Sequence, residues 1–99
     1  MTYWMLFQYA PQAAVDTPLG VYVSREDVRA MCVFSSDEKA AAAQTQVPEA
    51  HGYYMESVQP DDVAALAVMH GIDVVALDAW VAEKAALIPT TDVVSALGT

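Results

Sequence analysis

Neighbouring carboxylates occur at three places in this chain, and they are the residues that most resemble acid–base machinery. The pairs are Glu26–Asp27, Asp37–Glu38 and Asp61–Asp62. Adjacent residues of a helix point to different faces, so the two members of a pair cannot act together on one substrate. Each pair also lies at an expected helix start, where the helix dipole favours anions. We therefore predict no catalytic residue and no enzymatic activity.

The histidines and the single cysteine show no metal-binding or nucleophile pattern. His51 and His70 have no His or Cys four residues away, so a metal site would require them to meet in space beside Asp62 or Asp73. Cys32 is the only cysteine, which excludes an intrachain disulfide and favours a small buried hydrophobe. The chain also lacks a glycine-flanked serine and a phosphate-binding glycine loop. We predict no metal and no cofactor.

The charge balance argues against a nucleic-acid ligand. The chain has 99 residues, with 4 Lys and Arg against 13 Asp and Glu, and a formal net charge of −9. Residues 51–99 hold seven of these acids and only one base. Phosphate neutralisation supplies most of the affinity for nucleic acid, so direct binding is not expected. A basic protein is the better partner.

The composition also predicts the cellular compartment of the protein and an apolar patch on its surface. Hydrophobic residues make up 56% of the chain, which argues against disorder and implies an exposed apolar patch. Such a patch would suit a partner protein or a homodimer. No apolar run is long enough to span a bilayer, and residues 1–10 lack a signal-peptide pattern. We predict a cytoplasmic protein that does not bind membranes.

The first half of the chain has the pattern of a small sheet with one helix. Strands are expected over residues 2–10, 20–23 and 52–58. In the last of these, Tyr54, Glu56 and Val58 should share one face and alternate with Tyr53, Met55 and Ser57. Residues 24–34 suit a helix or a strand, and we favour a strand over 28–34. Ser35 with Glu38 forms a capping-box pattern before an alanine-rich helix that should end before Pro48.

The second half has the pattern of three helices. Pro60 suits a first helical position, and the helix should run to His70 and stop at Gly71. A second helix is expected from Asp73 to about Leu87, and a short one over residues 92–97. The predicted fold is therefore α+β, with a small antiparallel sheet and one short helix followed by a C-terminal three-helix unit. The expected units, residues 1–58 and 59–99, would share one core.

Residues 61–84 carry the spacing of a helix-turn-helix. A small residue, Ala67, precedes Gly71 by four positions, and apolar residues follow at Ile72, Leu77 and Trp80. This spacing resembles the helix-turn-helix family, which implies two helices crossing closely and a second helix that reads DNA. The exposed positions of that second helix would carry only acidic, valine and alanine side chains. A DNA-reading surface is therefore not expected.

A weaker likeness covers residues 31–58. The stretch CVFSSDEKAAAA followed by GYYMESV is similar to small uncharacterised proteins common in phages and mobile elements. In those proteins a strand, a short capped helix and a return strand form one unit. The resemblance implies an origin and no particular activity.

Our leading hypothesis is a non-enzymatic inhibitor that occupies the basic nucleic-acid-binding surface of a host protein. Phage anti-CRISPR and anti-restriction proteins are often of this size and charge. The predicted partner-binding residues are Trp4, Asp61, Asp62, Asp73, Asp78 and Glu83.

Two alternatives remain open. A helix-turn-helix DNA-binding regulator would need its four basic residues on one face; they are Arg25, Arg29, Lys39 and Lys84. A homo-oligomeric structural or assembly subunit would be sealed by an apolar helix from Val74 to Ile88.

Overall fold

The aromatic segment near the start of the chain forms strand β1 (Tyr3–Gln8), the middle strand of a three-stranded sheet. Our computed structural model describes residues 2–23, 27–78 and 86–98. Met5 and Leu6 point to opposite faces of β1, and both are fully buried. Strand formation here is confirmed, and it follows from a run of aromatic and large apolar side chains that is covered on both faces.

Two antiparallel neighbours complete this first sheet. β2 (Thr17–Pro18) and β5 (Tyr54–Val58) lie on either side of β1. The second sheet has four strands in the order β3-β4-β6-β7, in which β4 and β6 are parallel and the outer pairs are antiparallel. Its strands are β3 (Gly20–Val23), β4 (Val28–Val33), β6 (Val74–Leu77) and β7 (Ala86–Pro89).

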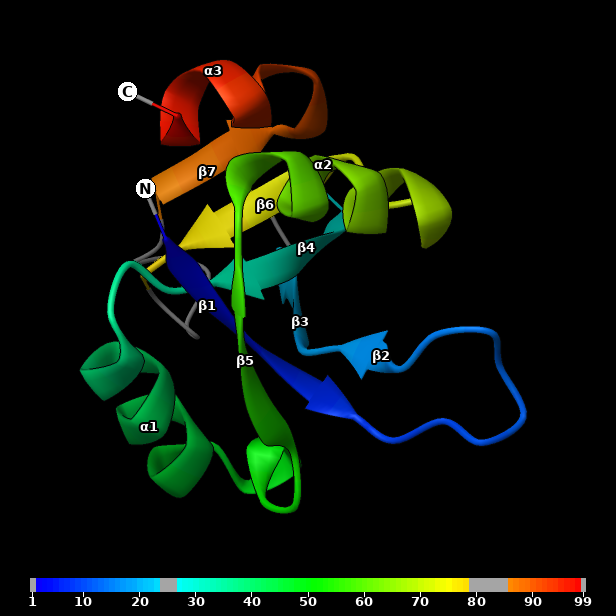
Figure 1. Ribbon diagram of the computed structural model, residues 1–99, viewed down its shortest axis with the longest axis vertical. Helices are drawn as coiled ribbons and strands as arrows, with labels where there is room; N and C mark the ends of the chain where they lie inside the picture. The colour runs from blue at the N-terminus through cyan, green and yellow to red at the C-terminus, as the bar shows by residue number, and fades with distance from the viewer. Residues whose placement is uncertain (1, 24–26, 79–85, 99) are drawn as a thin grey trace.

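Short helices cover the sheets (Figure 1). α1 packs against β1 and β5, whereas α2 packs against α3 near the C-terminus. Two 3-10 turns, η1 and η3, precede β5 and α3. The bounds are α1 (Asp37–Gln46), η1 (Pro48–Ala50), α2 (Pro60–Met69), η3 (Thr90–Asp92) and α3 (Val93–Leu97). Among the described residues, no helix is long and apolar enough to cross a membrane.

The two sheets are joined through their backbones. Trp4 and Phe34 exchange two hydrogen bonds of 2.8 Å, which link β1 to the end of β4. Leu19 lies between β2 and β3 and bonds to both sheets: its N–H donates to the Leu6 carbonyl, and its carbonyl accepts from the Cys32 N–H. The sheets therefore share one continuous hydrogen-bonded frame.

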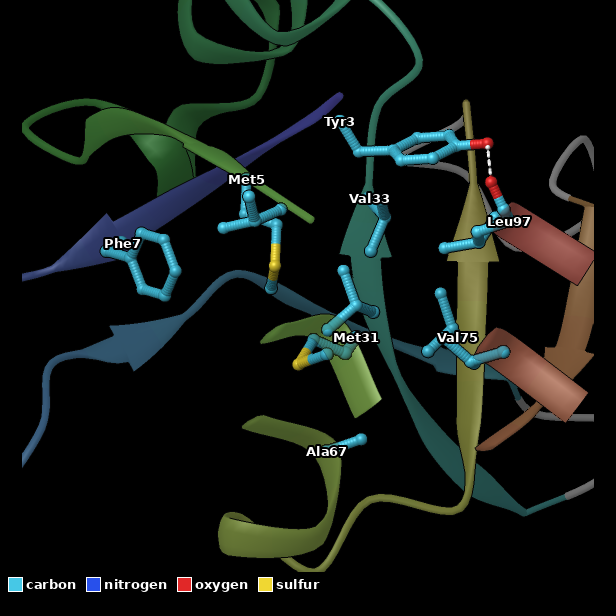
Figure 2. Close-up of a cluster of buried hydrophobic side chains, with 11 residues drawn as sticks. Tyr3, Met5, Phe7, Met31, Val33, Ala67, Val75 and Leu97 are labelled. Atoms are coloured by element: carbon cyan, nitrogen blue, oxygen red, sulfur yellow. Dashed lines mark hydrogen bonds between the residues drawn. The ribbon is translucent and has the colours of Figure 1, made fainter. Parts of the chain in front are cut away.

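The largest core cluster connects the two ends of the chain. Side chains from β1, β4 and β6 meet those of α2 and α3 (Figure 2). Within this cluster the buried Tyr3 hydroxyl donates a 2.8 Å hydrogen bond to the Leu97 carbonyl. Val58 and Val63 lie on either side of the predicted unit boundary, and both belong to this cluster.

The predicted fold of one small antiparallel sheet followed by a C-terminal three-helix unit is wrong. The described strands form two sheets, and β4 and β6 are parallel. The first helix is confirmed, with Pro60 in its first turn and a positive φ of 66° at Gly71. Where the second helix was predicted, residues 74–77 form strand β6, and residues 86–89 form β7. The apolar run VVAL is too short for its periodicity to distinguish a strand from a buried helix. It forms a strand because it pairs with β4. Trp80 lies outside the described residues.

The start of α1 also differs from the prediction. Ser36, rather than Ser35, is the N-cap, and its hydroxyl accepts from the Lys39 N–H at 3.2 Å. Ser35 is engaged elsewhere, because its N–H and hydroxyl both donate to the Asp78 carboxylate. Because Ser35 bonds to a residue 43 positions away, the next residue, Ser36, caps the helix.

Cys32 is buried, as the sequence predicted. It belongs to a second core cluster, beneath α1, whose buried residues are Leu6, Leu19, Cys32, Phe34, Ala40, Ala43 and Ala50. Burial raises the pKa of its thiol to about 12, with a smaller opposing effect from Arg29. Because the thiolate is the reactive form, we expect Cys32 to be inert to thiol reagents in the folded protein and to react on unfolding. Labelling with a chromogenic disulfide in increasing urea measures this; rapid labelling without urea would contradict it.

Candidate functional site

The predicted partner-binding acids do not form one site. Asp61 and Asp73 are exposed at opposite ends of the α2 segment. Asp62 is exposed too, and its carboxylate accepts from the Gln59 N–H at 2.9 Å in a capping box that starts α2. Glu83 lies outside the described residues.

Asp78 has a structural position. Its carboxylate accepts from the N–H and hydroxyl of Ser35 at 2.6 and 2.7 Å, and it pairs with the Lys39 ammonium at 3.2 Å. Burial alone would raise the pKa of this carboxyl, but these donors outweigh burial and hold the pKa below its usual value. Asp78 thereby ties the end of β6 to the start of α1, and little of its charge is left for a partner.

Trp4 is only half-buried, but it packs against the cluster beneath α1. Its backbone also forms the bridge to Phe34. The side chain therefore supports the core.

A groove on the other face of the first sheet is the best candidate site. It has a volume of about 420 Å³ and lies between strands β1 and β5, helix α2 and the loop before β2. Most of its apolar residues are buried or half-buried, whereas Ala65 and Met69 are exposed. The apolar residues are Phe7, Val15, Val58, Ala65, Leu66 and Met69.

The polar lining of the groove is acidic. Three carboxylates contribute to it, Asp16 from the loop, Glu56 from β5 and Asp62 from α2, and the part of the lining that the structure describes contains no Lys or Arg. Such a site fits a ligand with an apolar body and a cationic end, because the floor can cover the apolar part while the acids receive the charge.

A tyrosine–carboxylate pair forms part of the groove lining. The Tyr54 hydroxyl donates to the Asp16 carboxylate, whose other oxygen accepts from the Ala10 N–H at 2.9 Å. The bond to Tyr54 and then that to Ala10 hold the pKa of Asp16 below its usual value. The same bond raises the pKa of Tyr54 to about 12. At neutral pH Asp16 is therefore ionised and Tyr54 is protonated. The pair holds one negative charge and is unsuited to acid–base catalysis.

Replacing Asp16 with Asn should lower the pKa of Tyr54 toward the usual tyrosine value of about 10. The physical reason is that a neutral amide no longer opposes ionisation of the phenol. Ultraviolet titration of phenolate formation, with Tyr54→Phe to assign the transition, measures the shift. An unchanged transition would show that Asp16 does not hold the Tyr54 hydroxyl.

The sequence indicates which residues of β5 and α2 share the face that lines the groove. The alternation of Tyr54, Glu56 and Val58 on one face of a strand was predicted, and Asp62, Leu66 and Met69 follow helical spacing on one side of α2. The sequence pattern does not single out Asp16 or Glu56 as a site residue. Asp16 lies in a proline-containing loop without periodicity, and only the tertiary fold brings it to Tyr54.

The structure also bears on metal binding. Among the described residues, no group of three His, Cys, Asp or Glu side chains could hold a metal ion.

Residues 74–77 and 86–89 are strands and form no recognition helix. The helix-turn-helix regulator therefore lacks its DNA-reading element in these segments. For the same reason the predicted dimer helix from Val74 to Ile88 is wrong. Arg25 and Lys84 lie outside the described residues.

Comparisons of this chain with protein-family models, curated proteins and solved structures found no match.

Proposed function

We propose that this chain is a non-enzymatic binding protein whose acidic groove receives a basic region of another protein. The groove carries the proposal, because it combines three carboxylates with an apolar floor, and no basic residue occurs among its described lining residues. A positively charged partner is attracted to such a surface, whereas nucleic acid and anionic lipid are repelled.

The arrangement of acids over the whole surface supports the same conclusion. Eleven of the thirteen acids lie in the described part of the chain, and among these residues only Asp78 forms an ion pair. The unpaired carboxylates leave a negative field that can steer a basic protein into contact.

The biological setting that we propose is inhibition in the cytoplasm. The partner is a host protein that uses a basic surface to bind nucleic acid, and the carboxylates of this chain take the place of phosphates. Inhibitors of phage or mobile-element origin, of the anti-CRISPR or anti-restriction type, fit its size and its net charge of −9.

Affinity capture from a bacterial lysate, with this chain immobilised, tests the proposal. We expect basic nucleic-acid-binding proteins to be retained at low salt, released at high salt and displaced by duplex DNA. Retention that is unaffected by both salt and DNA would contradict it.

A matched pair of charge reversals places the contact. Glu56→Lys changes the groove, and Glu49→Lys makes the same change in net charge at an exposed residue that does not line it. We expect Glu56→Lys to weaken binding of the captured partner by about tenfold or more, and Glu49→Lys to have a smaller effect. Calorimetry measures both; equal losses would show that only the overall charge matters.

A further inference from the structure

Among the segments that the structure describes, the strand that carries Glu56 has an unpaired edge. β5 is the outer strand in the order β2-β1-β5. Trp4 is the partner of Ser57 in the β1–β5 register, but both backbone groups of Trp4 bond to Phe34 instead. Hydrogen-bonded pairs alternate along an antiparallel ladder, so β5 bonds to β1 through Tyr54, Glu56 and Val58. The backbone groups of Met55 and Ser57 therefore point away from the sheet.

No other described segment pairs with this edge. Within the described residues, Met55 and Ser57 have no backbone hydrogen bond to a further strand, loop or helix, and Ser57 is exposed. An edge strand with free N–H and C=O groups is a template on which another extended segment can pair. Because Ser57 and Glu56 also line the groove, the edge and the groove form one continuous surface.

We infer that an extended basic segment of the partner protein adds to the free edge of β5 and places Lys or Arg side chains over the acidic groove. This inference rests on the proposed function and specifies how the partner binds. Alternate side chains of an added strand point to one face, so a basic residue at every second position would meet Glu56 and Asp62. The aliphatic stems of these residues would lie along the apolar floor.

Charge complementarity selects this occupant over a second copy of the chain. Pairing of two β5 edges would bring the groove of one copy, with its three carboxylates, toward that of the other. Each chain also carries a net charge of −9, so like charges would oppose that dimer. A basic strand gains from the same carboxylates.

Ser57→Pro tests the edge without disturbing the β1–β5 ladder. Proline removes the N–H that points away from β1, and proline is tolerated on the open side of an edge strand. Ser57→Ala loses the same hydroxyl but keeps the N–H. The probe is a short synthetic peptide of alternating Lys and Val. We expect Ser57→Pro to weaken its binding by about tenfold or more and Ser57→Ala to change it little.

Methylated peptides give a second test that needs no variant. One peptide carries N-methyl groups on its Lys amides and the other on its Val amides. Because alternate amides of a strand point to opposite edges, one of these peptides should lose affinity for the unmodified protein and the other should keep it. Equal binding of both methylated peptides and the unmodified one would overturn strand addition.

The outcomes separate this inference from the proposed function. If the lysine–valine peptide binds in a salt-dependent way but neither Ser57→Pro nor methylation affects it, strand addition is wrong and the acidic binding surface stands. If no basic protein or peptide binds at low salt, both are wrong. Self-association that Ser57→Pro abolishes, without peptide binding, would identify a second copy as the occupant and overturn the inference.

Discussion

Replacement of Phe34 by Ala is expected to lower the free energy of unfolding by about 3–5 kcal/mol. Phe34 is the largest fully buried side chain in the described part of the chain. Its cluster beneath α1 contains three buried alanines, Ala40, Ala43 and Ala50. Alanine side chains cannot extend into a vacated space, so most of the cavity should persist and the loss should lie toward the upper end of this range.

Urea unfolding followed by tryptophan fluorescence measures the change. Tyr9→Ala is the matched control, because Tyr9 is also aromatic but is 72% exposed. A surface truncation of this kind should stay within about 0.5 kcal/mol of the parent. A loss for Phe34→Ala no greater than that of Tyr9→Ala would show that the cluster beneath α1 does not hold the fold.

Replacement of Asp78 by Ala has the second largest expected effect, a loss of about 2–3 kcal/mol. The change removes the acceptor for the Ser35 N–H, the Ser35 hydroxyl and the Lys39 ammonium. Asp78 also has a φ of 61°, a conformation that Asp tolerates better than Ala. Asp78→Gly separates the two contributions, since Gly lacks the carboxylate but adopts positive φ freely.

We therefore expect thermal or urea unfolding to rank the parent as most stable, Asp78→Gly next and Asp78→Ala last. Asp73→Ala is the control at an exposed acid on the same segment. If Asp78→Ala is as stable as Asp73→Ala, the link between β6 and α1 contributes nothing and Asp78 is open to a partner after all.

The same carboxylate should make stability depend on pH. The pKa of Asp78 is lower in the folded protein than in the unfolded chain, where it is about 3.9. Its contribution is therefore complete above that unfolded value and is lost as the pH falls through the folded pKa. Asp78→Asn should lose stability at neutral pH and show a shallower decline in acid. A parallel decline for both proteins, measured by urea midpoints at several pH values, would contradict this assignment.

Local patterns in the sequence predicted most of the first half. The strand at β1, the choice of a strand over 28–34, and the helix ending before Pro48 were confirmed by β1, β4 and α1. These segments depend on propensity and on nearby caps, which neighbouring residues decide. The first C-terminal helix was predicted for the same reason, through Pro60 and Gly71.

Long-range pairing explains what the sequence did not show. Val74 and its neighbours form a strand because β4 offers a parallel edge on which they pair. The one-residue error at the N-cap of α1 has a similar cause, since Asp78 binds Ser35 from 43 residues away. Neither contact leaves a local signal.

The candidate site divides in the same way. The sequence alone showed the acidic charge. It also predicted a basic partner and placed Glu56 and Tyr54 on one face of their strand. The tertiary structure alone brought Asp16 to Tyr54, set Asp62 across from Glu56, and left the outer edge of β5 unpaired. Charge and alternation are properties of neighbouring residues, whereas a groove and a free edge exist only once distant segments have packed.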